Sequence, residues 1–176
     1  MNIKIIILTA LCFFSCSDFE KEKSSVDDLI DRVESIEKGF LKIKIDTISS
    51  LKMSTYEVER QIKQNYTVDS IDLVLGKKMN DYKRMRKMLG PLGKEEARLK
   101  GGLFEVKEQL MKLRTDISKG NGKREMYFEY IEFETNKVNQ IKTLYDEYIK
   151  TRRDFLDIYN RLNAELIALS LSLRSK

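Results

Sequence analysis

The residue types that do most of the chemistry in enzymes are scarce in this chain. It has no histidine, and its two cysteines, Cys12 and Cys16, lie within the first sixteen residues. Most acid–base, nucleophilic and zinc sites need one of these side chains. Carboxylates remain, and pairs such as Glu132 with Glu134 could in principle hold a metal. We therefore expect a non-enzymatic protein without metal or cofactor, with a carboxylate-based hydrolase as the less favoured alternative.

Short matches to enzyme motifs lack the context that the chemistry requires. Ser35 with Lys38, and Ser49 with Lys52, have the Ser-x-x-Lys spacing of serine acyl enzymes, but the accompanying motifs are missing from the sequence. The Gly-Lys pair at 93–94 has neither the following Ser or Thr nor the preceding strand of a phosphate-binding loop. None of these matches predicts an active site, and no small-molecule substrate is evident.

The densest group of positive side chains lies between residues 77 and 87. Its members are Lys77, Lys78, Lys83, Arg84, Arg86 and Lys87, offset only by Asp81. One interpretation is a solvated face near a helix end, where positive charge suits the helix dipole. The other is a surface for anionic lipid or polysaccharide, formed by Lys77, Lys83, Arg84, Arg86 and Lys87. The net charge of +5 is too small to indicate a nucleic-acid partner.

An aromatic segment at 126–133 is apolar on more than one helical face. In a three-helix bundle only Tyr127 and Ile131 of this segment need burial. Phe128, Tyr130 and Phe133 are then spare. They are either covered by the first helix or form an exposed patch that binds a protein partner, since large apolar patches often mark interfaces.

These residues must be positioned by long helices, and the clearest helix is the last one. From Tyr127 to Leu173, apolar or aromatic residues recur at alternating steps of four and three, interrupted only by Glu134 and Arg152. This is the heptad spacing of a coiled coil, and no Gly or Pro breaks it. We predict one helix over 123–173, whose apolar seam must be buried against the rest of the chain.

The preceding chain supplies two more seams with the same spacing. The first covers 25–64 and changes register near Thr47, and we expect a continuous helix there. The second covers 68–119 and keeps its phase through Gly90-Pro91-Leu92-Gly93, although proline and glycine weaken a helix. This phase favours a kinked continuation over a chain reversal at 90–93.

The sequence therefore predicts an all-α fold, an elongated antiparallel three-helix coiled coil, with a four-helix bundle reversing at 90–93 as the alternative. The glycines around Asn121 predict a tight turn between the last two helices. Residues paired across that turn should have numbers that sum to about 242. Arg152 would then lie opposite Gly90, where its guanidinium either caps carbonyls freed by Pro91 or extends outward from the seam edge. Glu134 and Lys78 are polar seam positions that either lie at a solvated edge or form a polar pair that fixes the register.

The N-terminus has the pattern of an export signal. Lys4 precedes an apolar run from Ile5 to Phe14, which is too short to span a bilayer, and Ser15 and Cys16 follow. This ending resembles the lipobox of bacterial lipoproteins. The resemblance implies a signal peptide over 1–15 and lipidation of Cys16. The polar, charged residues that follow predict a flexible tether over 16–24, and the seams predict a single helical domain over 25–176. Ser17 after the cysteine resembles outer-membrane sorting in diderm bacteria.

Together these features predict a lipid-anchored helical scaffold or binding protein of the bacterial cell envelope. It would be attached to a membrane, most simply the outer membrane, and would present its coiled coil to a protein partner or to a second copy of itself. A surface adhesin and a periplasmic chaperone-like clamp are the alternatives. The identity of the partner, the side of the membrane and the oligomeric state stay open.

Overall fold

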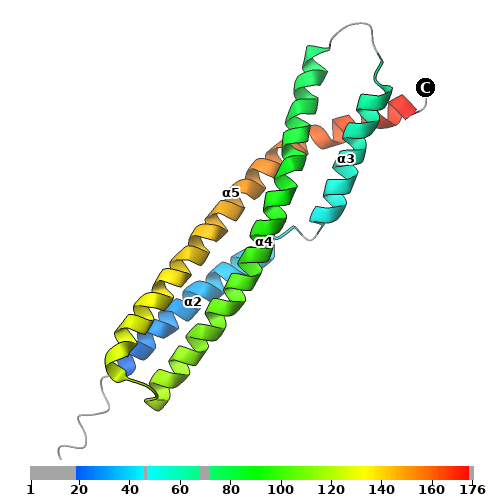
Figure 1. The fold of residues 1–176 in the computed structure, drawn as a ribbon. Coiled ribbons are helices and arrows are strands. Elements are labelled where there is room, and N and C mark those ends of the chain that lie inside the picture. The colour runs from blue at the N-terminus through cyan, green and yellow to red at the C-terminus, as the bar shows by residue number, and fades with distance from the viewer. Residues whose placement is uncertain (1–18, 46, 68–71, 175–176) are drawn as a thin grey trace, which may run out of the picture. The chain divides into compact units, whose positions relative to one another are not determined.

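A computed structural model describes residues 19–45, 47–67 and 72–174 (Figure 1). Within these ranges the chain forms helices and no strand. The long elements are α2 (Phe19–Ile43), α3 (Ile48–Asn65), α4 (Leu73–Lys119) and α5 (Tyr127–Arg174), and a 3₁₀ turn η1 (Arg124–Met126) precedes α5. The predicted all-α fold, with long helices packed against one another, is confirmed.

The packing divides the chain into two compact units. The first unit takes its described residues from 19–41 and 101–142, so that α2 packs with the C-terminal part of α4 and the N-terminal part of α5. The second unit takes its described residues from within 42–100 and 143–174, and combines α3 with the other parts of α4 and α5. Each unit is therefore a three-helix bundle.

The apolar seams predicted from the sequence form the core of both units. In the first unit the buried residues are Val26, Leu29, Val33, Ile36, Phe40, Leu103, Val106, Leu110, Ile117, Tyr127, Val138 and Ile141. In the second unit they are Ile62, Tyr82, Met85, Leu89, Leu92, Leu99, Tyr148, Phe155, Ile158, Leu162 and Leu166. Burial of these side chains is the main force that holds the helices together.

The tight turn between α4 and α5 is confirmed. Gly120 and Gly122 have φ angles of +64° and +87°, which residues other than glycine rarely adopt. The two helices are antiparallel, and contacts join Glu105 to Lys137 at 3.9 Å in the first unit and Tyr82 to Asn163 at 2.7 Å in the second. These pairs sum to 242 and 245, close to the predicted value of 242.

The chain does not reverse at 90–93. Helix α4 continues through Pro91, and Leu89 and Leu92 on either side of it are both buried. Pro91 itself lies on the exposed side of the helix, where water can replace the missing backbone donor. The continuation that the seam phase favours is therefore correct, and the four-helix alternative is wrong.

The prediction of one continuous helix over 25–64 is wrong, because the helix ends at Ile43 and restarts at Ile48. These two seam positions are five residues apart in the sequence. An unbroken helix turns about 100° per residue, so it would rotate the second seam away from the core by about 140°. The break between α2 and α3 removes this mismatch. Its backbone is held in part by Glu96 of α4, whose Oε2 accepts the N–H of Ile45 at 3.4 Å.

The expected boundary at Ser25 is also wrong, because α2 begins at Phe19. The ring of Phe19 lies 6.1 Å from that of Tyr127, and the guanidinium of Arg124 lies 4.7 Å from the centre of the Phe19 ring. Ser25 is inside the helix and donates to the carbonyl of Lys21 at 3.0 Å. Residues 19–24 therefore belong to the packed bundle, whereas the expected signal peptide over 1–15 and the lipidated Cys16 lie outside the described residues.

Candidate partner-binding surfaces

The three spare aromatic residues of α5 are all exposed. Phe128, Tyr130 and Phe133 have 74%, 44% and 59% of their surface open to solvent, whereas Tyr127 beside them is buried. Covering by the first helix, the more conservative of the two interpretations, does not occur. Helical geometry turns Phe128 well away from the other two rings, at about 100° per residue. The three residues thus do not form a single patch.

Tyr130 and Phe133 line a groove of about 260 Å³ in the first unit. The other wall comes from α4. Its lining residues there are Gln109, Lys112, Leu113 and Asp116, and Glu134 of α5 completes the groove. The groove thus combines two exposed aromatic rings with charged side chains of both signs.

Glu134 is the unusual member of this groove. Only 7% of its surface is exposed, and its Oε2 has no hydrogen-bond partner among the described residues. Lys137 approaches the other oxygen at 3.8 Å and also lies 4.8 Å from the centre of the Phe133 ring. Burial raises the pKa of Glu134, the charge of Lys137 lowers it, and the charge of Glu105 raises it again, with a net increase. A buried acceptor without a donor is costly, and an incoming donor would remove that cost.

The carboxylates do not assemble into a metal site in the described part of the chain. No group of three or more His, Cys, Asp or Glu side chains there is arranged to hold an ion. Glu132, the neighbour that the sequence pairs with Glu134, is exposed whereas Glu134 is buried.

The cationic stretch of α4 separates into paired and unpaired members. Arg86 donates to the buried Glu59 at 2.9 Å and lies over the ring of Tyr56, while Lys78 pairs with Glu165. Burial would raise the pKa of Glu59, but hydrogen bonds from Lys63 and Arg86 outweigh it and lower the pKa. Arg86 is therefore a structural residue and not part of a free anionic-surface site.

The remaining members of that stretch are exposed. Arg84 contacts Asp81 at 3.3 Å, and Lys77, Lys83 and Lys87 form no ion pair with any described residue. Of the five residues that the sequence predicts for an anionic surface, these four stay available to solvent.

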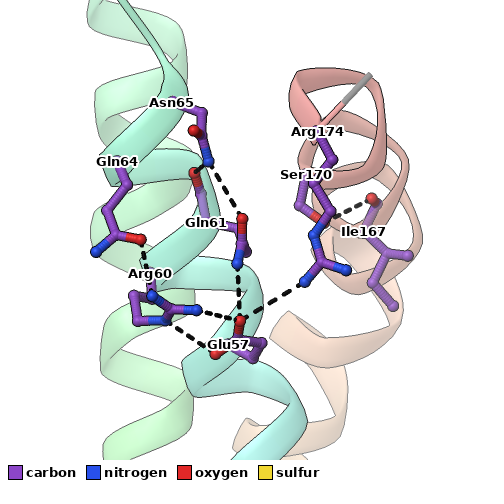
Figure 2. A network of polar contacts seen from close by, with 8 residues as sticks. All are labelled: Glu57, Arg60, Gln61, Gln64, Asn65, Ile167, Ser170 and Arg174. Carbon is purple, nitrogen blue, oxygen red and sulfur yellow. Dashed lines mark hydrogen bonds and ion pairs between the residues drawn. The ribbon is translucent and has the colours of Figure 1, made fainter. Parts of the chain in front are cut away.

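A second polar network joins α3 to the end of α5 (Figure 2). The carboxylate of Glu57 accepts hydrogen bonds from Arg60 at 2.6 Å and from Gln61 at 2.8 Å, and Arg174 lies 3.6 Å away. The hydrogen bonds from Arg60 and Gln61 lower the pKa of Glu57 to about 2. Every partner is already supplied by the chain, so this network is structural and has no free group for a ligand.

Of the two alternatives for Arg152, capping of the carbonyls freed by Pro91 is not seen in the described structure. The Nε of Arg152 is buried and has no hydrogen-bond partner among the described residues, so no bond from this atom reaches the carbonyls before Pro91. The side chain lines a groove of about 470 Å³ with mainly apolar walls, including Ile43, Ile149 and Leu156. The polar contacts nearby are made by Glu96 of α4, which accepts hydrogen bonds from the backbone of Ile45 and from the phenol of Tyr148.

Comparison with protein-family models, curated proteins and solved structures found no match to this chain. In the part of the chain that the structure describes, no helix is both long enough and apolar enough to cross a bilayer. Function must therefore be inferred from the surfaces themselves.

Proposed function

We propose that this protein is a lipid-anchored, non-enzymatic binding protein of the bacterial cell envelope. Its N-terminal sequence supports the anchor, because Ser15 and Cys16 follow a short apolar run as in a lipobox. An acyl anchor with more than one chain holds a protein firmly on a bilayer. The outer membrane is the destination that Ser17 favours.

The observation that carries the binding role is the groove beside Glu134. Exposed aromatic rings next to a charged rim are typical of protein interfaces. In this groove Tyr130 and Phe133 offer apolar contact, and Oε2 of Glu134 offers a buried acceptor that the described chain leaves unused. The partner that complements it is a protein segment with an apolar side chain next to an arginine or lysine, which would donate to Glu134.

A photo-cross-linking amino acid in place of Phe133 tests this role in intact cells. The matched control carries the same group in place of Phe104, which is also exposed in the first unit. We expect a discrete cross-linked product from position 133 that is absent from position 104 and is lost when Glu134→Ala is added. Equal products at both positions, or none at 133, would contradict a partner in this groove.

The anchor is tested separately. Labelling of cells with a palmitate analogue should mark the parent chain and not the Cys16→Ser variant, and that variant should leave the membrane fraction. Protease treatment of whole cells then distinguishes a surface adhesin, which is cleaved, from a periplasmic scaffold or clamp, which is protected. An unlabelled parent chain, or label on the Cys16→Ser variant, would exclude lipid anchoring at this residue.

A further inference from the structure

A row of unpaired cations runs along the outer side of α4 in the second unit. Lys83, Lys87, Lys94 and Arg98 are all exposed and follow one another at steps of four, seven and four residues. At about 100° per residue these steps keep the four side chains within about 60° of one another. We call these four residues the cationic face.

The cationic face points away from the core. The buried seam of the same helix segment is formed by Tyr82, Met85, Leu89 and Leu92. Helical geometry places the centre of this seam about 170° around the helix from the cationic face. The four cations are therefore free of the core packing that fixes the seam.

No acid neutralises the cationic face within α4. The segment between Asp81 and Glu95 contains no Asp or Glu. Asp81 lies on another side of the helix, and the half-buried Glu95 forms no ion pair with its neighbour Arg98 in the described structure. Asp81 contacts Arg84 and Arg161, at 3.3 Å and 3.6 Å. No ion pair joins any residue of the cationic face to another described residue, in contrast to Lys78 and Arg86. This separation is unusual in a chain where 33 basic residues are interspersed with 28 acidic ones.

The residues of α4 around the four cations are small, and none of them is a large apolar residue. Gly90, Pro91 and Ala97 lie between them along the helix, and a Cβ added to Gly90 would meet no atom within 4 Å. A flat anionic surface can therefore approach the helix closely. A nucleic-acid site would need far more positive charge.

We propose that the cationic face binds the anionic headgroups of a lipid bilayer. Cations near such a surface each raise the affinity about fivefold, and the effect fades within a Debye length. The inference uses the proposed lipid anchor, because a tether keeps the whole chain near the bilayer and makes this contact intramolecular. Even a weak contact between the cationic face and the bilayer is then formed for a substantial part of the time.

The test uses the lipidated full protein with a fluorophore on Ala97→Cys, which lies beside the cationic face. The dye reports whether this position is in water or at the lipid interface. Vesicles of phosphatidylcholine alone are compared with vesicles that also contain phosphatidylglycerol. Asn160→Cys, exposed on α5 of the same unit, carries the dye as the position control.

We expect the dye at position 97 to move to the interface only on the phosphatidylglycerol vesicles, and to return to water at high salt. Replacing the four cations by serine should reduce the interfacial population at least about tenfold. A charge-matched control replaces Lys52, Lys100, Lys150 and Arg153 by serine, all of them exposed in the second unit, and should keep the response.

The outcomes separate this inference from the anchor. If the protein floats with both kinds of vesicle and the dye at 97 never responds, the cationic face does not bind lipid although the anchor exists. If it floats only with phosphatidylglycerol vesicles, through the four cations, the anchor is wrong and the cationic face is supported. A response to polyglutamate in solution without one to phosphatidylglycerol would overturn the proposal in favour of an acidic protein partner.

Discussion

The buried phenol of Tyr148 on α5 donates a hydrogen bond of 3.3 Å to Oε2 of Glu96 on α4. The same oxygen accepts the backbone N–H of Ile45 at 3.4 Å, in the segment where α2 has ended and α3 has not begun. A single carboxylate oxygen thus connects two long helices of the second unit to the break in the first helical region. It takes up a backbone donor that the break leaves without a helical partner.

Loss of this contact should destabilise the second unit. Tyr148→Phe removes one donor and should lower the unfolding free energy by about 1 kcal/mol. Glu96→Ala leaves both donors, the Tyr148 hydroxyl and the Ile45 N–H, without an acceptor and should lower it by about 2 kcal/mol. Urea unfolding followed by circular dichroism measures both values. Tyr145→Phe, a half-buried tyrosine one turn away, is the control and should change little. Equal costs for the Tyr145 and Tyr148 variants would show that the hydrogen bond contributes nothing.

The same tyrosine predicts a loss of stability in alkali. Burial, and after it the negative charge of Glu96, raises the pKa of Tyr148 to about 12, compared with about 10 in an unfolded chain. The folded state thus favours the protonated phenol, and its contribution is complete below pH 10 and is lost as the pH rises towards 12. Unfolding free energies measured across this window should fall less steeply in Tyr148→Phe. An unchanged slope would show that Tyr148 does not titrate in this range.

Much of the fold could be predicted because it depends on local spacing. The four-three steps identify the seams that are buried, and their phase across Pro91 correctly favours continuation over reversal. The break between Ile43 and Ile48 could not be predicted, because a change of register is equally compatible with a stutter in one helix. The contact that stabilises the break comes from Glu96, about fifty residues away in sequence.

The surfaces were less predictable than the seams for a related reason. Whether Phe133 is covered depends on which side of α5 the first helix occupies, and spacing along α5 carries no such information. Likewise Arg86 and Lys87 are neighbours in one basic run, but only Arg86 meets an acid from another helix. Glu134 could be recognised as a polar seam position, but its missing donor is visible only in three dimensions.

The pair of Arg86 and Glu59 should behave as a buried ion pair. Arg86→Met removes one partner and leaves Glu59 with Lys63 alone, 2.6 Å away, so we expect a loss of about 2 kcal/mol of unfolding free energy. The double variant with Glu59→Leu should recover most of that loss, because it leaves no buried charge. A double-mutant cycle by urea unfolding measures the coupling. Purely additive effects would mean that the two side chains do not interact.

The lowered pKa of Glu59 also predicts how its contribution to stability changes with pH. Its charged form is favoured in the folded state, so its contribution is complete above the unfolded value near pH 4 and disappears as the pH falls through the lower folded value. The acid-induced loss of stability should therefore be smaller in the double variant than in the parent.

Two adjacent glycines of α4 offer a matched test of the packing between α4 and α5 in the first unit. A Cβ on Gly101 would meet no atom within 4 Å, whereas a Cβ on Gly102 would lie only 2.4 Å from Cδ1 of Ile141. Gly101→Ala should therefore stabilise the protein by about 0.5–1 kcal/mol through helix propensity. Gly102→Ala gains the same propensity but must displace the end of Ile141, and should be less stable than Gly101→Ala by about 1 kcal/mol. Thermal unfolding compares them, and equal melting temperatures would mean that the helices are farther apart.

Arg152 should be replaceable by an apolar residue with a gain in stability. Its Nε is buried without a hydrogen-bond partner among the described residues, which is costly for a polar atom. Arg152→Leu keeps most of the apolar contact with the neighbouring groove and should raise the unfolding free energy by about 1 kcal/mol. The positive charge of Arg152 also lowers the pKa of Tyr148, so this variant should shift the tyrosine titration to still higher pH. Arg153→Leu, at an exposed position, should change stability by less than about 0.5 kcal/mol. A loss of stability in Arg152→Leu, with an unchanged Arg153→Leu, would instead support the capping of carbonyls near Pro91.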